Sequence, residues 1–337
     1  MQIINLVPDL RPVILAARQM RDDRNSLSRF LPNVNVQAVS YRLGRRRRLD
    51  QTVPVRAFDA PATPIKRPGL LDVQGELPAI TPIIDLSEQD LNNEMILAQQ
   101  LAGMQVDWQP WVTSAAGQAA LTVDNTLEQM RGQLLSTGKV TLTAEDGATH
   151  EVDFEVPADN IITAAAVWDY TDPAAVFADY AAAAVQFLDA SGSEPGVALT
   201  TAKIRILLVN AVQQLFPNAP VGNTELNAYL ANRNLPQVAT YDRKLVGDDG
   251  TKSSVYPDGM ITFLPSNDAP VGRTELGVTQ ESVQQVQNRV LTSTEAPGLT
   301  VVTLGQDNPV QRAVKGAAIG LPILRDNDDI VILKGLS

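Results

Sequence analysis

One segment, residues 113–157, decides the fold, and it reads TSAAGQAALTVDNTLEQMRGQLLSTGKVTLTAEDGATHEVDFEVP. Its first half carries apolar residues at the 4-3-4-3-4 spacing of one helix face: Ala116, Ala120, Val123, Leu127, Met130 and Leu134. Gly138 follows at the position of a left-handed helix cap. Residues 139–143 and 150–156 then alternate with period two around a turn at 145–147, which predicts a hairpin. We therefore expect a helix of about two dozen residues, roughly 35 Å long, leading directly into a β-hairpin.

The composition of the chain narrows its class. It has 337 residues, of which 44% are hydrophobic, enough for a sizeable core in one or two domains. We find no apolar run of membrane-spanning length and no secretory segment, which favours a soluble protein kept in a cytoplasm. Cysteine is absent, so disulfides, thiolate zinc sites and cysteine nucleophiles are excluded. With His150 as the single histidine, catalytic triads and multi-histidine metal sites are hard to build.

The net charge of −11 is unevenly distributed along the chain. Residues 1–67 hold 13 Lys and Arg against five acids, giving +8, whereas the remainder holds 14 basic and 33 acidic residues, giving −19. A basic leader on an acidic body indicates that the leader contacts something acidic. Nucleic acid and the acidic body of another copy are both candidates.

The N-terminal quarter predicts an arm and an extended loop. A helix is expected from about Arg11 to Phe30, broken at 22–25, and its modest apolar content would make it marginal in isolation. Residues 34–84 contain short strands near 34–41 and 52–58 and six prolines, which is too proline-rich for central sheet strands. This pattern favours an extended, two-stranded excursion that needs a surface to lie on.

Residues 161–250 predict a compact α/β subdomain. Asp172 and Pro173 are typical of a helix start, and Gly192 of its end. A second helix is expected over 201–216 with Ile204, Leu208, Ala211 and Leu215 facing inward, and a third over 224–233. Elsewhere we expect a helix over about 87–105, interrupted at 107–111 before the long helix, and strands at 197–199, 237–244, 259–264, 299–304, 317–324 and 330–334.

The most prominent cluster of functional side chains is cationic. Arg45, Arg46, Arg47 and Arg48 follow one another in a predicted turn. Guanidinium groups bind phosphates and carboxylates through two parallel hydrogen bonds, so this turn predicts an acidic partner. Three interpretations stay open for it: ion pairs with a neighbouring subunit, nonspecific DNA contact, and a solvated patch. The residues nominated for intersubunit contact are Arg42, Arg45, Arg46, Arg47, Arg48, Arg56, Lys66 and Arg67.

Other chemistry is weakly indicated. His150 could act as a general base, but a structural or solvated histidine is the more ordinary reading of its context. Asp326, Asp328 and Asp329 lack the continuation of a calcium loop and read as an acidic turn. We predict no catalytic, cofactor-binding or metal site, and no enzyme activity.

The order of elements and three local segments resemble the major capsid proteins of tailed bacteriophages, of the phage lambda gene E type with the Hong Kong-phage capsid fold. Residues 135–143 are similar to that family's helix-to-hairpin junction, residues 261–265 with 271–272 to its late strand and turn, and residues 321–332 to its closing segment. The resemblance covers most of the chain from about Ser26. It implies an α+β fold with an N-terminal arm (1–33), an extended β-loop (34–84), a peripheral domain with the long spine helix and hairpin (85–160 and 251–337) and an α/β axial domain (161–250).

The resemblance also implies a function and partners. Copies would assemble into hexamers and pentamers of an icosahedral shell around double-stranded DNA, which they would bind without sequence specificity. Scaffolding, portal and decoration proteins would be further partners. The shell would be assembled in the host bacterial cytoplasm, and the protein would finally be located in the virion capsid. No cofactor or membrane is implied. Two alternatives remain: the shell of a cellular nanocompartment with the same fold, and a soluble α/β enzyme or binding protein.

Overall fold

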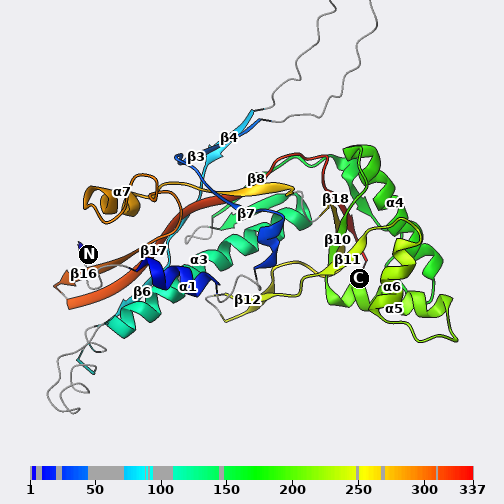
Figure 1. Ribbon diagram of the computed structural model, residues 1–337, viewed down its shortest axis with the longest axis horizontal. Coiled ribbons are helices and arrows are strands. Elements are labelled where there is room, and N and C mark those ends of the chain that lie inside the picture. The colour runs from blue at the N-terminus through cyan, green and yellow to red at the C-terminus, as the bar shows by residue number, and fades with distance from the viewer. Residues whose placement is uncertain are drawn as a thin grey trace, which may run out of the picture.

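A computed structural model describes residues 2–4, 10–19, 25–44, 72–87, 89, 92–93, 109–143, 148–247, 250–266, 270–308 and 310–336. The molecule is elongated, with a long sheet and a long helix at one end and a helical subdomain at the other (Figure 1). The described helices are α1 (Arg11–Gln19), α3 (Gln109–Thr137), α4 (Pro173–Ser191), α5 (Ala202–Leu215), α6 (Asn223–Ala231) and α7 (Gln280–Gln287), with 3-10 turns η1 (Ser26–Arg29) and η2 (Ala158–Asn160).

Helix α3 is the long helix that the sequence predicts. The six residues of the predicted face are all buried, and Gly138 caps the helix with a φ of 72°, which confirms both expectations. The helix starts earlier than expected, at Gln109, because Pro110 falls in its first turn, where the missing N–H has no helical partner to lose. Residues 107–111 therefore do not all interrupt the helix.

The hairpin consists of β7 (Lys139–Thr143) and β8 (Thr149–Asp153), paired from Lys139 with Asp153 to Thr143 with Thr149. The second strand ends at Asp153 and not at Val156. The side chain of Asn327 donates hydrogen bonds to the carbonyls of Phe154 and Glu155, and Glu155 has a φ of 51°. These contacts turn the chain away from the ladder.

A seven-stranded sheet packs along α3. Its main order is β1-β16-β17-β15-β2, and β5 and β6 pair with β17 off that path. The strand β17 is the longest and buries most of its residues against α3 and its neighbours. The strands are β1 (Gln2–Ile4), β2 (Asn33–Asn35), β5 (Ala79–Ile80), β6 (Ile83–Leu86), β15 (Gly272–Leu276), β16 (Thr300–Asp307) and β17 (Val310–Leu324).

The second sheet separates α3 from the helical subdomain. Its order is β11-β10-β14-β18-β9, and the residues of β10, β14 and β18 alternate between two apolar clusters. Leu199 and Ile332 face α3, whereas Ala198, Phe263 and Leu333 face the helices. The strands are β9 (Ile161–Thr163), β10 (Val197–Thr200), β11 (Gln237–Thr240), β14 (Met260–Leu264) and β18 (Val331–Lys334), with a separate pair β12 (Lys244–Val246) and β13 (Lys252–Ser254).

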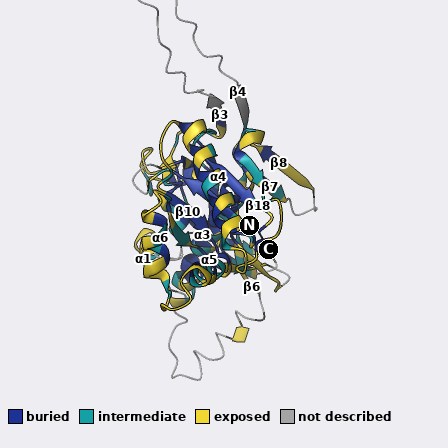
Figure 2. Ribbon diagram, turned by 90° about the vertical axis from the view of Figure 1, so that its right-hand side faces the viewer, coloured by how far each residue is buried: buried dark blue, intermediate teal, exposed yellow. Residues whose placement is uncertain are grey.

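Helices α4, α5 and α6 cover the far face of this sheet, and their outer surfaces are exposed while the strands behind them are buried (Figure 2). The start of α4 is confirmed, because Asp172 accepts a hydrogen bond from the amide of Ala175 and Pro173 is the first helical residue. Its end at Gly192, with a φ of 71°, is confirmed as well. The inward position predicted for Leu215 is wrong: it is the last residue of α5, where the chain turns away from the sheet, and it is 40% exposed.

The helix expected from Arg11 is confirmed over Arg11–Gln19, whereas most of its expected break at 22–25 lies outside the described residues. Helix α1 lies on the N-terminal half of α3, where Arg18 makes a paired hydrogen bond with Asp124 at 2.8 and 2.9 Å, and η1 follows after residues 20–24. The expected helix over 87–105 and the expected strand near 52–58 fall almost wholly outside the described residues. In the described part of the chain, no helix has both the length and the hydropathy needed to cross a membrane.

Candidate functional site

Of the eight nominated cations, the structure describes Arg42, which lies on a strand that projects from the body. Strands β3 (Ser40–Gly44) and β4 (Asp72–Glu76) form a two-stranded ladder that extends away from both large sheets (Figure 1). The backbone of Arg42 pairs with that of Gln74. The other seven nominated cations lie outside the described residues: Arg45, Arg46, Arg47, Arg48, Arg56, Lys66 and Arg67. Their role as intersubunit contacts stays a prediction.

The base of this loop is held closely against β15. The amide of Val36 donates to the carbonyl of Leu276 at 2.8 Å. A Cβ added at Gly277 would lie 2.3 Å from the carbonyl oxygen of Ala38, so no larger residue fits there without moving the backbone. Within the ladder, Tyr41 is 5% exposed and its ring covers Gly75. The loop therefore leaves the body from a tightly packed point.

A buried polar cluster lies beside this base, on the C-terminal half of α3. Arg131 donates to Glu128 at 2.9 Å, to the hydroxyl of Thr274 at 2.9 Å and to the side-chain oxygen of Asn33 at 2.5 Å. The side chains of Arg131 and Glu128 are only 3% and 0% exposed. Charges that have left water need such partners, since an unpaired buried charge is strongly unfavourable.

Glu128 joins two further segments to α3. It accepts a hydrogen bond from the amide of Leu27 at 3.0 Å and one from the hydroxyl of Tyr241 at 2.8 Å. Burial, followed by the neighbouring Glu128 carboxylate, raises the pKa of Tyr241, so the phenol stays protonated and remains a donor. The ion pair thus connects η1, β2, β15 and the segment after β11 to a single helix.

Sequence reasoning missed this cluster. Glu128 and Arg131 have the i, i+3 spacing of an ordinary surface pair on a helix. The available signal was their position: both residues flank Leu127 and Met130 on the buried face. A charged pair next to an apolar stripe on a helix covered from two sides is expected to be buried.

Acidic side chains are concentrated in one stretch of the chain, after the first strand residue of the hairpin. Residues 140–202 contain no Lys or Arg and eleven acids: Glu145, Asp146, Glu151, Asp153, Glu155, Asp159, Asp169, Asp172, Asp179, Asp189 and Glu194. Of the nine that lie in the described ranges, all but Asp179 are exposed. They are spread along the chain from β8, through η2 and β9, to α4 and the segment that follows α4. We call these nine residues, with the turn described next, the acidic surface.

The acidic turn 326–329 packs against the same surface. Asn327 donates to the carbonyls of Phe154 and Glu155, and Asn160 donates to the carbonyl of Asn327. Asp326, Asp328 and Asp329 are thereby placed next to the end of the hairpin. Within the described ranges, no three or more such side chains converge as metal ligands would.

One cation partly offsets the charge of the acidic surface. Lys139 on β7 contacts Glu151 at 2.7 Å and Asp153 at 3.0 Å across the hairpin. The hydrogen bond to Glu151, then that to Asp153, raises the pKa of Lys139. His150 lies on the same hairpin and is exposed. The hairpin therefore presents a charged face to solvent and not an enclosed pocket.

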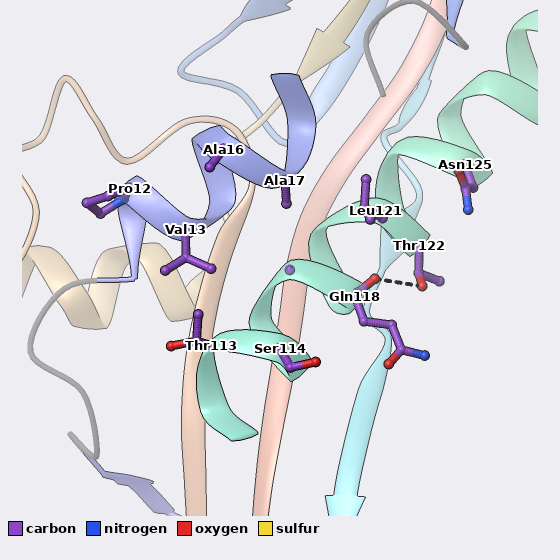
Figure 3. Close-up of a pocket in the computed structure, with 11 residues that line it drawn as sticks. Pro12, Val13, Ala16, Ala17, Thr113, Ser114, Gln118, Leu121, Thr122 and Asn125 are labelled. Atoms are coloured by element: carbon purple, nitrogen blue, oxygen red, sulfur yellow. Dashed lines mark hydrogen bonds between the residues drawn. The ribbon is translucent and has the colours of Figure 1, made fainter. Parts of the chain in front are cut away.

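An apolar groove lies between α1 and the N-terminal half of α3, with a volume of about 910 Å³ (Figure 3). Short or neutral side chains line it, and none of them can act as a general acid or base at neutral pH. The lining residues are Pro12, Val13, Ala16, Ala17, Thr113, Ser114, Gly117, Gln118, Leu121, Thr122 and Asn125. The groove offers packing surface and no catalytic chemistry.

Exposed apolar side chains are a further feature of the helical subdomain. Val185 and Leu188 on α4 are 55% and 42% exposed, and Ile206 on α5 and Phe216 after it are 56% and 50% exposed. Large apolar side chains exposed on helices next to one another are typical of contact surfaces between proteins. With the projecting loop and the acidic surface, they indicate a molecule whose functional parts are contact surfaces.

Known proteins resemble the chain over almost all of its length. The family model described as phage major capsid protein E matches residues 27–334. A solved structure of a protein assigned to the capsid of a prophage in E. coli CFT073 superposes with a TM-score of 0.58 at 15% identity, covering 96% of this chain and 98% of that one. A phage-related protein of Bordetella bronchiseptica RB50 superposes with a TM-score of 0.57 at 11% identity, covering 96% of each chain. At such identities the likeness is one of fold alone. No curated protein matches the sequence.

Proposed function

The chain belongs to the phage major capsid protein E family, and from this membership we propose how its copies contact one another in the shell. The α+β capsid fold inferred from the sequence is confirmed by the family match and by the solved structures. The protein is a structural component of a phage capsid, built from copies of itself. We further propose that these copies form hexamers and pentamers of an icosahedral shell around double-stranded DNA, assembled in the host bacterial cytoplasm, and that the protein has no catalytic activity.

The contact we propose joins the cationic loop of one copy to the acidic surface of the next. The observation that carries it is the separation of charge: 13 of the 27 Lys and Arg precede residue 68, whereas residues 140–202 have none. The exposed acids of this surface repel one another in the isolated subunit, a repulsion that the contacts of Lys139 with Glu151 and Asp153 offset only in part. A cationic segment from outside would relieve that repulsion.

The direction of the loop supports a contact between copies over one within a copy. Strands β3 and β4 lead away from the body, and in the sequence residues 45–71 connect Gly44 to Asp72. Each half of that segment, about 13 residues, can span at most about 45 Å when extended. This reach suffices to cross to a neighbour. Because the loop and the acidic surface are different parts of the chain, the contact is heterologous, and such contacts form a ring when the rotation between copies closes.

The chemistry of arginine fits this contact. A guanidinium group donates two parallel hydrogen bonds to a carboxylate, so Arg45–Arg48 could engage several acids at once. Each exposed ion pair contributes little, commonly 0–1 kcal/mol, and salt screens it further. A cluster of such pairs repeated in every subunit can nevertheless stabilise a closed shell.

We extend the proposal to the other partners of the shell. The shell would enclose DNA without reading its sequence, because backbone phosphates attract cations regardless of sequence. The net negative charge of the body would keep the shell from binding the enclosed DNA tightly. Scaffolding, portal and decoration proteins are proposed as further partners.

Replacement of Arg45, Arg46, Arg47 and Arg48 by Ser tests the contact. We expect the purified variant to stay folded but to lose closed shells, as counted by electron microscopy and sedimentation. The matched control replaces four exposed cations elsewhere, Lys203, Lys244, Lys252 and Arg289, by Ser, which changes the net charge equally. Shells from the loop variant as numerous and salt-resistant as wild-type shells would reject the contact.

The enclosed DNA is tested separately on particles from infected or lysogenic cells. We expect double-stranded DNA that resists added nuclease until the particles are disrupted. Particles that hold protein cargo and no protected DNA would contradict the DNA part of the proposal and leave the shell part standing.

A further inference from the structure

The short strand β2 has no hydrophobic pattern to fix its register. It contains only Asn33, Val34 and Asn35, all of which are exposed, and it lies at the end of the seven-stranded sheet. Register is strongly specified where one face of a strand is buried, and weakly where both faces are open. Leu31 before β2 and Val36 after it pack into the core, and a polar contact within the strand adds to them in holding β2 parallel to β15, with Asn33 opposite Thr274.

Arg131 makes that contact. Its guanidinium donates to the side-chain oxygen of Asn33 at 2.5 Å and to the hydroxyl of Thr274 at 2.9 Å, which are the two residues that face each other across the ladder. The hydroxyl of Thr274 in turn donates to the carbonyl of Leu31 at 2.9 Å. A planar group with donors in fixed directions can satisfy both acceptors only when they are side by side.

Glu128 holds the guanidinium in place. The two side chains are bonded at 2.9 Å and are almost completely buried, so Arg131 cannot turn away without leaving Glu128 unpaired. Replacing a buried ion pair by apolar residues is often neutral or stabilising for the fold itself. A role in selecting one arrangement of the chain explains its presence better than a role in stability.

The register of β2 determines where the projecting loop begins. Four residues, 36–39, separate β2 from β3, and Val36 already bonds to Leu276 at the end of β15. Successive residues of a strand point to opposite faces, so a shift by one residue would reverse every side chain of β2 and displace the start of the loop by about 3.3 Å.

We propose that Arg131 is a positioning residue that sets the register of β2 and, through it, the path of the cationic loop towards the neighbouring subunit. The expected effect on the shell rests on the loop contact proposed above. The register itself can be measured on the full-length subunit alone.

The test measures register by cross-linking, which a chain without native cysteine permits. Val34→Cys with Glu275→Cys places two thiols at directly paired positions, and neighbouring strands about 4.8 Å apart are within the range of a disulfide. Into this background we introduce Asn33→Ala, which removes an exposed acceptor of Arg131 and leaves the Arg131–Glu128 pair intact. Asn33→Asp restores an acceptor, and Asn35→Ala is the matched control on the same strand.

We expect Asn33→Ala to lower the rate of cross-linking roughly tenfold, as loss of one charge-assisted hydrogen bond allows, while Asn33→Asp and Asn35→Ala cross-link at nearly the parental rate. Equal cross-linking of Asn33→Ala and the parent would overturn the inference. Shell assembly of Asn33→Ala without the added cysteines then tests whether the register of β2 affects the contact between the cationic loop and the neighbouring subunit. Lost cross-linking with normal shells would uphold the register role and count against the loop contact.

Discussion

The body around α3 and the helical subdomain are both held together by buried apolar side chains, but they differ in the charged groups that they bury. Four charged residues are buried among the described residues, namely Asp124, Glu128, Arg131 and Glu275, and all four belong to α3 or to β15 beside it. The cluster that joins α4, α5 and α6 to their sheet is composed of apolar and aromatic side chains. Its tyrosine, Tyr180, donates to the carbonyl of Pro236 at 2.8 Å.

This difference separates two ways of holding a chain together. The helical subdomain relies on apolar burial by helices that start and end at local signals. The α3 body gathers distant segments, η1, β2 and the residue after β11, through hydrogen bonds to a few buried charges. We expect the first region to respond to changes in volume and the second to changes in charge.

The largest effect is expected for Arg131→Met. It leaves Glu128 buried without its cationic partner, which typically costs about 3–5 kcal/mol in the free energy of unfolding. Chemical denaturation of the subunit measures the loss. Arg18→Met is the control, since the pair that Arg18 of α1 makes with Asp124 of α3 is more exposed and should cost less. The double variant Glu128→Leu with Arg131→Met should recover part of the loss, and failure to recover any would count against a charge-based explanation.

A slightly smaller effect is expected for Leu208→Ala in the helical subdomain. Leu208 is fully buried on α5, and its truncation leaves a cavity that should cost about 3 kcal/mol. Leu215→Ala, on the same helix but 40% exposed, should cost much less. The loss of stability in Leu208→Ala should be the same whether or not Glu128→Leu is added, whereas Glu128→Leu should reduce the loss in Arg131→Met. Equal denaturation midpoints for the two leucine variants would contradict the contrast.

The same contrast explains what could be predicted from the sequence. The face of α3, the caps at Gly138 and Gly192 and the start of α4 depend on residues within a few positions, so periodicity and capping rules found them. Arg131, by contrast, bonds to partners 98 and 143 residues away, and its spacing from Glu128 looks like that of a surface pair. No local pattern carries that information.

The candidate site divides in the same manner. The cationic cluster and the charge imbalance are visible in the composition alone. The acidic surface is not, because it brings the hairpin together with residues 326–329 through side chains about 170 positions apart, such as Asn160 and Asn327. The pairing of β5 and β6 with β17 was equally hidden, since prolines around them obscured the strands.

A third prediction concerns a local signal in the helical subdomain. Asp172→Ala removes the acceptor for the amide of Ala175 at the start of α4 and should cost about 1 kcal/mol. Asp189→Ala, near the other end of the helix, is the control. Its loss should be neutral or slightly favourable, because a negative charge near a helix C-terminus is unfavourable. Thermal unfolding of both variants measures the difference, and a larger loss for Asp189→Ala would contradict the capping role.

The smallest effect is expected for an exposed charge of the α3 body, Glu295. The amide of Thr292, then its hydroxyl, and then the neighbouring Arg11 lower the pKa of Glu295 below its ordinary value of 4.5. A carboxyl with a lowered native pKa stabilises the fold above the unfolded pKa, and this stabilisation disappears as the pH falls through the native value. Glu295→Gln should therefore melt slightly below wild type at pH 7, and the two melting temperatures should converge as the pH falls below 4.5. Added salt at pH 7 should also narrow the gap, because solvent and ions reach this pair but not Glu128 and Arg131. If the difference in melting temperature persisted at low pH, the shape of the side chain and not its charge would distinguish Gln from Glu at this position. The dependence of the stability of the α3 body on charge would then come from its buried ion pairs alone.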